Sequence, residues 1–487
     1  MMIETEQKKE FRLSYKFRIY PKKNQIQKMN NMMYEEKKVY NELLGLKKDT
    51  YLFLGLRYFF NYTLDIEKEN EIFRGFRFIF GIYYYGNKKS LSKYDLINHL
   101  SGRCKTGKLY SQSYGALADV VIKSYDNFFR RFKEHKQGSL KKNELGFPKF
   151  KSYIDFIIYP QAGFKIVDEK SLFISKIGYI PIIFHRNMLG KIKTLTIKKN
   201  KSNDWHVCFS CDISKETIIN LNNPLDIINI IGIDNNTGKD WMTLSNGEKI
   251  SYPRYLIKAQ KRLLMLQKKL SKKRIGSNNR KKHKILLAKE YQKVIDKRDN
   301  FFHQITNQLT NKYNIICCED TNIKELVVQN SKKNKDKSKL TSKNINILDC
   351  SWGKFKQILI YKQQMKGGLL LNNPRTRGSS KRCSNCDFEK DVLHMPLNIR
   401  EYVCENCGLR LDRDVNAANN HLKNCLEKHN QEIKNYMLKN SISKLNIENT
   451  DGLSEIEAQQ RINNGWFNEV GTTFKKVQVI EPIIGSP

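Results

Sequence analysis

The sequence lacks any apolar run that is long enough to span a membrane. Its most apolar stretches, residues 51–60 and 78–85, are far below the roughly 18 residues that a spanning helix needs. The first six residues are acidic and contain no apolar core of a secretory signal. We therefore expect a cytoplasmic protein with no membrane partner. In a reducing cytoplasm its eleven cysteines should be thiols or metal ligands and not disulfides.

Acidic residues are scarce relative to basic ones. The chain has 49 Asp and Glu against 88 Lys and Arg, which gives a formal net charge of +39. So basic a protein needs a polyanion, and nucleic acid is the usual one because each neutralised phosphate releases a counterion. An anionic membrane surface ranks second, because the charge is spread along the chain and not gathered on one amphipathic helix or tail. Biased codon usage alone would raise Glu together with Lys.

The length of the chain predicts several domains, and the periodicity of residues 11–213 predicts strands that flank a helical segment. At about 150 residues per domain, 487 residues suggest about three. Residues 11–20 alternate as a half-buried strand does, and the spacing from residue 24 to about 131 is helical. Short strand-like runs return later, the clearest being a hairpin of residues 192–198 with 205–213.

Two nearly continuous apolar strands are predicted in the carboxy-terminal half. Residues 226–234 end in Asp234, and residues 313–318 are followed by Glu319. Such strands suit the buried sheet of an α/β domain. A long, very basic helical region, residues 256–309, lies between them.

Four cysteines have the spacing of a zinc ribbon. Two Cys-x-x-Cys pairs are separated by seventeen residues, and they comprise Cys383, Cys386, Cys404 and Cys407. Four soft thiolates satisfy tetrahedral zinc and leave no position for water, so the zinc is expected to be structural. Cys208 and Cys211 lie in an alternating strand with no second pair at ribbon distance, and we interpret them as structural residues.

Three acids are candidates for a second metal site. Asp234 and Glu319 end the apolar strands, and Asp414 follows the ribbon. Phosphodiester cleavage needs an activated water and a stabilised leaving oxygen, which two magnesium ions about 4 Å apart supply when carboxylates hold them. Taken singly, each strand-end acid could equally be a solvated cap.

The segment from Cys404 to Asn420 resembles the terminal motif of TnpB proteins, which are transposon-encoded relatives of compact type V CRISPR effectors. The motif reads Cys-x-x-Cys-Gly, then Asp-Arg-Asp-x-Asn-Ala-Ala-x-Asn. Residues 15–21, 40–43 and 147–152 also resemble family segments, with less specificity.

The resemblance implies a RuvC-type, RNase H-like nuclease. The family's catalytic acids fall on Asp234, Glu319 and Asp414, with Asp320 and Asp412 as second choices, and together they would bind magnesium, with two ions expected. The resemblance also implies a guide RNA that selects the target DNA by base pairing, while the protein reads a short flanking motif. It does not decide between a monomer and a homodimer.

The expected fold is therefore multidomain, α/β plus α+β. We assign residues 1–23 and 146–225 to a β-barrel-like wedge domain, 24–145 to a helical recognition domain, 226–375 and 408–430 to the RuvC-like nuclease domain, 376–407 to the zinc ribbon, and 431–487 to a tail of unknown role. The helical region around residues 50–98 is longer than in minimal relatives. The excess could contact the guide–target duplex, which we favour, or could only enlarge the helical bundle.

The chain departs from the family pattern at three places. Asn236 stands where the family has Gly, and a left-handed turn there would tolerate Asn better than most residues. Asp387 replaces the Gly that closes the first zinc knuckle, and Ser379–Ser380 replaces Thr-Ser. None of these changes removes a ligand.

Four alternatives to a TnpB-type RNA-guided DNA endonuclease remain open. The chain could be a miniature type V CRISPR effector, or a cleavage-dead RNA-guided repressor, for which the Asn236 turn leaves room. A zinc-ribbon binding protein without catalysis would leave the strand-end acids unexplained. A DNA-joining transposase fits the motifs less well than a nuclease does.

Overall fold

The computed structural model describes residues 11–60, 91–102, 107–140, 144–214, 227–238, 240–320, 323, 327, 342–374, 379–390, 399–439 and 444–447. The chain divides into two compact units, residues 1–215 and 216–487. None of the helices in the described ranges is long and apolar enough to cross a membrane. The segment at residues 50–98 that was expected to contact a duplex lies largely outside these ranges, as do the cysteine-free residues 448–487.

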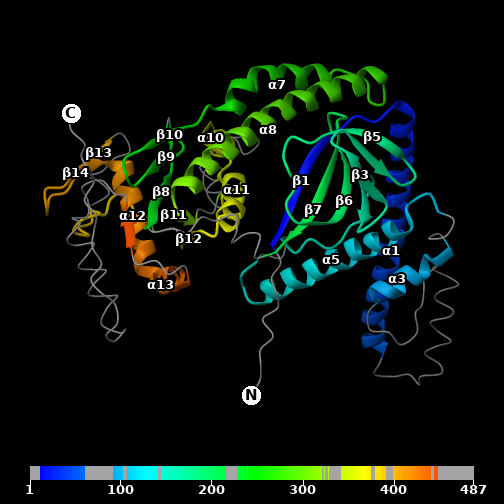
Figure 1. The fold of residues 1–487 in the computed structure, drawn as a ribbon, viewed down its shortest axis with the longest axis horizontal. Coiled ribbons are helices and arrows are strands. Elements are labelled where there is room, and N and C mark those ends of the chain that lie inside the picture. Colours follow the sequence, from blue (N-terminus) through cyan, green and yellow to red (C-terminus); the bar gives the residue numbers. More distant parts are fainter. Residues whose placement is uncertain are drawn as a thin grey trace. The chain divides into compact units, whose positions relative to one another are not determined.

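The first unit contains a seven-stranded antiparallel sheet with the order β2-β6-β7-β1-β5-β4-β3 (Figure 1). Its strands are β1 (Phe11–Ile19), β2 (Phe156–Pro160), β3 (Phe164–Asp168), β4 (Ser171–Ile174), β5 (Gly178–Ile183), β6 (Lys191–Lys199) and β7 (Trp205–Ile213). The expected amino-terminal strand is confirmed, because alternate residues of β1 are buried. So is the expected hairpin, in which β6 pairs with β7. No described residues join the edge strands β2 and β3, so the sheet is a half-barrel and not a closed barrel.

In the part of this unit that the structure describes, three helices accompany the sheet: α1 (Lys23–Phe60), α3 (Lys93–His99) and α5 (Ser111–Lys136). They confirm the helical spacing predicted from residue 24 onward, within the residues described. Helix α5 contacts α1, α3 and β2, and it buries an apolar stripe that includes Leu117, Val121 and Tyr125 at helical spacing.

The second unit is built on a mixed sheet with the order β10-β9-β8-β11-β12, and β15 also pairs with β8. Its strands are β8 (Ile227–Asn235), β9 (Asp240–Leu244), β10 (Lys249–Ser251), β11 (Ile315–Asp320), β12 (Leu369–Pro374) and β15 (Lys444–Ile447). Strands β8, β11, β12 and β15 pair in parallel with one another, whereas β9 pairs antiparallel with both β8 and β10. The two predicted apolar strands are therefore adjacent and parallel at the centre of this sheet.

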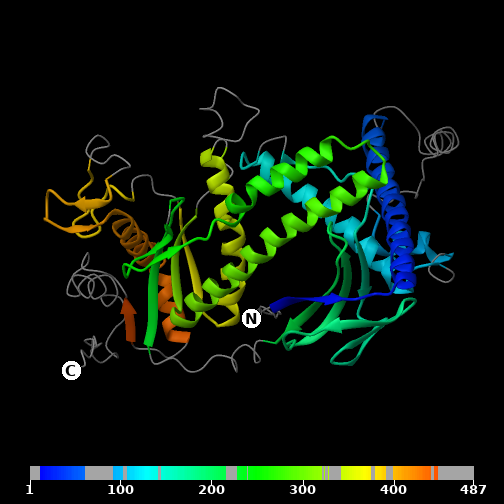
Figure 2. The same cartoon turned by 90° about the horizontal axis from the view of Figure 1, so that it is seen from above.

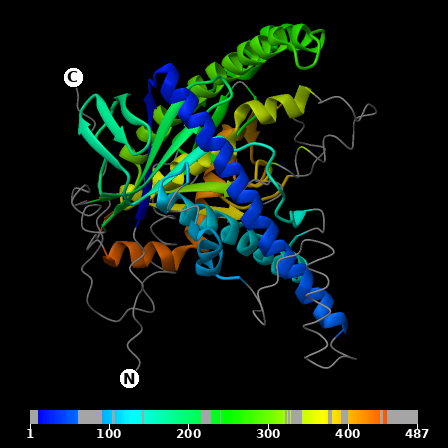
Figure 3. The same ribbon diagram turned by 90° about the vertical axis from the view of Figure 1, so that its right-hand side faces the viewer.

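Helices cover both faces of the mixed sheet. Helices α8 (Asn278–Lys312), α10 (Ser342–Cys350) and α11 (Trp352–Met365) bury a core around Trp241, Phe302 and Phe355 on one face. Helices α12 (Arg413–Lys428) and α13 (Asn430–Lys439) cover the other (Figure 2). The basic region between the central strands forms a hairpin of α7 (Tyr255–Ser271) and α8, which lie side by side (Figure 3). The two helices are separated by residues 272–277, which include Gly276.

Most of α13 and all of β15 lie within residues 431–487, the range assigned to a tail, and both pack in the second unit. Ile433 and Tyr436 of α13 pack into the core under α12, and Lys444–Ile447 extends the sheet beside β8. A four-residue strand carries almost no periodicity, so β15 could not be predicted from the sequence.

Candidate functional site

Asp234 and Glu319 lie at the carboxyl ends of the two central strands. The strands pair in parallel, with Ile233 opposite Cys318, so the two acids follow one another across the ladder. Even-numbered residues of β8 and odd-numbered residues of β11 pack toward α12, as Ile230 does. The same alternation assigns Asp234 and Glu319 to the face of the sheet that α12 covers.

Asp414 reaches this face from the first turn of α12. The side chain of Asp412 is the N-cap, and it accepts hydrogen bonds from the backbone N–H groups of Asp414 (2.9 Å) and Val415 (3.3 Å). Asp412 also pairs with Lys249 at 2.6 Å. Asp412 thus begins the helix, while Asp414, one residue into it, lies beside the strand ends.

The carboxylate of Asp414 is electrostatically coupled to that of Asp234. Burial and the nearby charge of Asp234 raise the pKa of Asp414, and an ion pair with Arg400 at 3.3 Å opposes this. The Asp414 and Asp234 side chains are only 14 % and 13 % exposed. Two partly buried acids that repel each other are the arrangement that a divalent cation relieves.

The three acids are not drawn together as tightly as metal ligands. Within the described part of the chain, the only group of three or more His, Cys, Asp or Glu whose ligand atoms all lie within 4.8 Å of one another is the set of four cysteines. The acids of β8, β11 and α12 thus share a face and an edge of the sheet without forming a tight ligand cluster.

Gly232 permits the close approach of α12 to β8. A Cβ atom at this position would collide with the backbone oxygen of Ala418 and would lie 2.8 Å from the Cβ of Leu422. Only glycine leaves room for the helix backbone here. Gly232, two residues before Asp234, thus lets α12 pack closely on β8. This close packing keeps Asp414 near the end of the strand.

Asn236 does not need the left-handed backbone that its departure from the family pattern suggested. It is absent from the described residues with positive φ. Its backbone N–H donates to the oxygen of Trp241 at 2.9 Å, and its side-chain amide donates to Thr243 Oγ1 at 3.3 Å. The turn after Asp234 is therefore an ordinary extension of the β8–β9 pairing, and Asn236 removes none of its support.

The four cysteines predicted as zinc ligands do form one cluster. Cys383 Sγ lies 3.7 Å from Cys407 Sγ, and Cys386 Sγ lies 3.5 Å from Cys404 Sγ. Tetrahedral zinc with sulfur at about 2.3 Å requires sulfur–sulfur separations of about 3.8 Å. The donor set therefore fits a tetrahedral, thiophilic ion. Cys208, Cys211 and the Cys317–Cys318 pair lie in β7 and β11, outside this cluster.

The two knuckles of this cluster have the same backbone design. In the first, the N–H of Asp387 donates to the oxygen of Cys383, and in the second the N–H of Gly408 donates to that of Cys404, both at 3.1 Å. The closing residues have φ of 64° and 72°. Asp387 therefore occupies a left-handed position that favours glycine.

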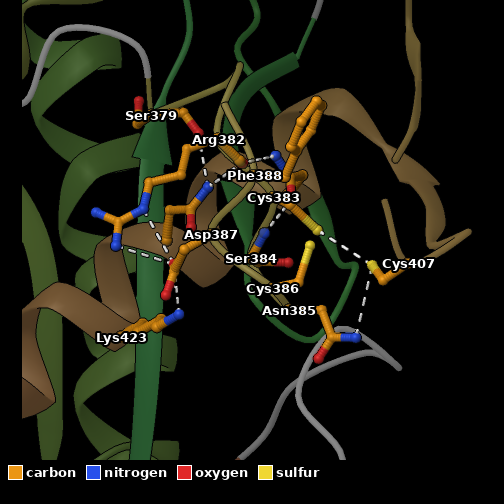
Figure 4. Close-up of polar contacts among 12 residues, drawn as sticks. Ser379, Arg382, Cys383, Ser384, Asn385, Cys386, Asp387, Phe388, Cys407 and Lys423 are labelled. Atoms are coloured by element: carbon orange, nitrogen blue, oxygen red, sulfur yellow. Dashed lines mark hydrogen bonds and ion pairs between the residues drawn. The ribbon is translucent and has the colours of Figure 1, made fainter. Parts of the chain in front are cut away.

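Asp387 gains ion pairs at this strained position (Figure 4). Its carboxylate pairs with Arg382 at 2.9 Å and with Lys423, a residue of α12 whose side chain is only 4 % exposed. Burial opposes ionisation, but these two cations outweigh it and lower the pKa of Asp387. A residue of the ribbon is thereby bound to the helix that carries Asp414.

Two asparagines of the terminal motif also attach the ribbon to α12. Asn416 accepts from the N–H of Ser384 at 2.9 Å and donates to the oxygen of Arg382 at 2.8 Å. Asn420 donates to the oxygens of Ser379 and Arg382, both at 2.7 Å. Together with Lys423 these residues are spaced by four and three along the helix, so one face of α12 is dedicated to the ribbon.

A buried histidine, which the sequence analysis did not single out, lies at the same site. His421 Nε2 is 3.4 Å from Asp234 Oδ1, and its side chain is fully buried. His421 is seven residues after Asp414, so both lie on one face of α12. The heptad spacing from Asp414 was the one signal in the sequence that could have identified it.

Three family models match separate parts of the chain. A model described as a probable transposase matches residues 222–335, and one described as a Cas12f1-like TNB domain matches residues 352–421. A third, described as a helix-turn-helix domain, matches residues 11–52. In that last range the structure has a strand followed by one continuous helix.

The curated relatives agree with these models. The chain is 33 % identical over 228 residues to a protein of Streptomyces pristinaespiralis, a match that covers 47 % of this chain and 51 % of the relative. It is 27 % identical over 308 residues to a protein of Escherichia coli, a match that covers 61 % of this chain and 70 % of the relative. Both relatives are named as candidate RNA-guided DNA endonucleases. A TnpB-like protein of Acanthamoeba polyphaga mimivirus is 30 % identical over 153 residues, which covers 31 % of this chain and 28 % of that protein.

Proposed function

Because the chain belongs to the TnpB family, we propose that it is an RNA-guided DNA endonuclease that hydrolyses phosphodiester bonds at the face shared by β8, β11 and α12. The observation that carries this proposal is the coupling of Asp414 to Asp234 at the carboxyl end of the central strands. The aligned region spans only about half of the Streptomyces relative, so the activity of the whole protein is part of the proposal.

Asp234, Glu319 and Asp414 are the residues that would hold magnesium. Carboxylate oxygens are the ligands that this hard cation prefers, and two such ions activate water and stabilise the leaving oxygen of a phosphodiester. The protein positions these acids on rigid elements: two adjacent strands and the first turn of a helix packed against them. Arg400 is 66 % exposed and pairs with Asp414. If a cation took the place of its guanidinium group beside Asp414, that group would be free to contact a phosphate.

The four cysteines would hold a structural zinc ion. All four ligand positions are filled by thiolates, so no position remains for water. The ribbon then acts through its attachment to α12, by Asn416, Asn420 and the Asp387–Lys423 ion pair. We propose that its role is to hold the amino-terminal end of α12, and thus Asp414, at the strand ends.

The proposed partners are a guide RNA and a target DNA. The excess of basic residues, 88 against 49, gives the protein a charge that polyanions neutralise. Sequence specificity would come from base pairing and the short flanking motif from the protein. A cleavage-dead repressor is less well supported, since all three acids are present and the turn at Asn236 is intact.

The direct test is Asp234→Ala in the full chain purified with its RNA. We expect cleavage of a matched DNA target to fall below detection, while the copurifying RNA is retained, because Asp234 lies at the metal site and not on a basic surface. Asp296→Ala is the matched control, since Asp296 is an exposed acid on α8 whose partner is Gln292. Cleavage by Asp234→Ala at the rate of the control would refute the assignment.

A further inference from the structure

His421 is a buried polar side chain whose ring has no hydrogen bond. Its exposed fraction is 0 %, and neither Nδ1 nor Nε2 has a hydrogen-bond partner. Its neighbours on α12 include Ala417, Ala418 and Leu422, all buried, so an apolar side chain would suit this environment. A buried donor that makes no hydrogen bond destabilises the folded state. The structure therefore keeps an imidazole here at a cost that packing alone does not explain.

The polar group that this imidazole approaches is the carboxylate of Asp234. The separation of 3.4 Å between Nε2 and Oδ1 is longer than a good hydrogen bond, which has its optimum near 2.9 Å. Catalytic hydrogen bonds are often long in an unliganded site and shorten when the ligand is bound. The backbone oxygen of His421 accepts from the buried amide of Asn373 at 2.6 Å, which fixes the helix at this residue.

From this geometry we propose that His421 is a positioning residue for Asp234. With a cation bound, the Nε2–H group would donate to Oδ1 and hold one carboxylate oxygen against α12, and the other oxygen would face Asp414 and the cation. The inference rests on the proposed function, since it assumes that Asp234 is a metal ligand. Partners that orient a ligating carboxylate are known to change metal affinity by about 10- to 100-fold when they are lost.

Two measurements distinguish a positioning role of His421 from a role in packing alone: the affinity for the metal and the stability of the protein without it. In His421→Leu the carboxylate of Asp234 loses its donor, so we expect the dissociation constant for Mn²⁺ to rise about 10- to 100-fold. The thermal midpoint of the zinc-loaded, magnesium-free protein should stay equal or rise, because an unsatisfied imidazole has been removed. His421→Gln places an amide N–H near the position of Nε2 and should keep an affinity close to wild type.

The experiment measures Mn²⁺ binding to the full chain by electron paramagnetic resonance of the free ion, without any cleavage step. Cys425→Ala is the control, a buried truncation one turn further along α12. The proposal is supported if His421→Leu binds Mn²⁺ more weakly at an unchanged or higher thermal midpoint, and if His421→Gln keeps an affinity close to wild type. Wild-type affinity in His421→Leu, or equal loss in both variants, overturns it. A wild-type protein that binds Mn²⁺ in this way but never cleaves matched DNA refutes the proposed function alone.

Discussion

The ion pair between Asp387 and Lys423 makes a quantitative prediction about the attachment of the ribbon to α12. Asp387→Gly restores the residue that favours φ near 64°, and relief of left-handed strain should stabilise the knuckle by about 1 kcal/mol. The same substitution leaves the ammonium group of Lys423, 4 % exposed, beside no carboxylate.

The loss of the ion pair should outweigh the gain from glycine. Breaking a fully buried pair costs roughly 3–5 kcal/mol, and an exposed pair contributes about 0–1 kcal/mol. One partner here is buried and Asp387 is 35 % exposed, so we expect an intermediate loss of about 2 kcal/mol. The net change for Asp387→Gly is then about 1 kcal/mol of destabilisation, which is roughly a fivefold change in an equilibrium constant.

A double-mutant cycle isolates the ion pair from the backbone effect. Lys423→Met keeps the length of the side chain and removes its charge, so Asp387→Gly combined with Lys423→Met should be at least as stable as wild type. We expect a coupling energy of about 2 kcal/mol between the two positions. Asp387→Asn is the matched control, because asparagine tolerates positive φ and lacks only the charge.

The assay is zinc release to a chromogenic chelator, measured with the denaturant midpoint of each variant. Asp387→Gly and Asp387→Asn should both release zinc faster than wild type, and Lys423→Met should suppress the effect of glycine. If Asp387→Gly is more stable than wild type, or if the effects of the two positions simply add, the ion pair does not bind the ribbon to α12.

Two further variants test the parts that this helix connects. Cys404→Ser should slow DNA cleavage by the folded protein, because a lost zinc ligand loosens the ribbon that holds α12 and so displaces Asp414. Normal cleavage by a folded, zinc-deficient variant would contradict this. Gly232→Ala should lower the denaturant midpoint by the equivalent of about 1–3 kcal/mol, because a new Cβ pushes Leu422 and the backbone of α12 away from β8. Gly102→Ala, whose Cβ would meet no atom within 4 Å, serves as the control, and equal midpoints for the two variants would refute the packing argument.

Local signals explain which features the sequence could predict. The strands that end in Asp234 and Glu319 are continuous apolar runs, and their adjacency follows from the few ways in which an α/β sheet buries such strands. The cysteine cluster follows from spacing alone, because each knuckle closes by bonds between residues four apart. The apolar runs and the knuckles themselves are set by residues a few positions apart, and such patterns are readable in a sequence.

Contacts that form only when α12 packs against the ribbon and β8 could not be predicted from the sequence. Lys423 and His421 look like ordinary polar residues of an amphipathic helix until α12 is packed against both the ribbon and β8. Asn236 was judged by the backbone of relatives, whereas its actual conformation is set by Trp241 and Thr243 across the turn. Tertiary partners decided each of these positions.

Helix α12 explains why the ribbon and the nuclease site occur together in this chain. Asn416, Asn420 and Lys423 face the ribbon, and the remaining faces carry Leu422 against β8 and Asp414 with His421 toward Asp234. A helix is stiff over 16 residues, so a displacement of the ribbon rotates or shifts the acid on the opposite face. The ribbon can therefore influence metal binding without contacting the metal. Substitutions on the ribbon face should change the affinity of the acid site for Mn²⁺ in proportion to the loss of ribbon attachment.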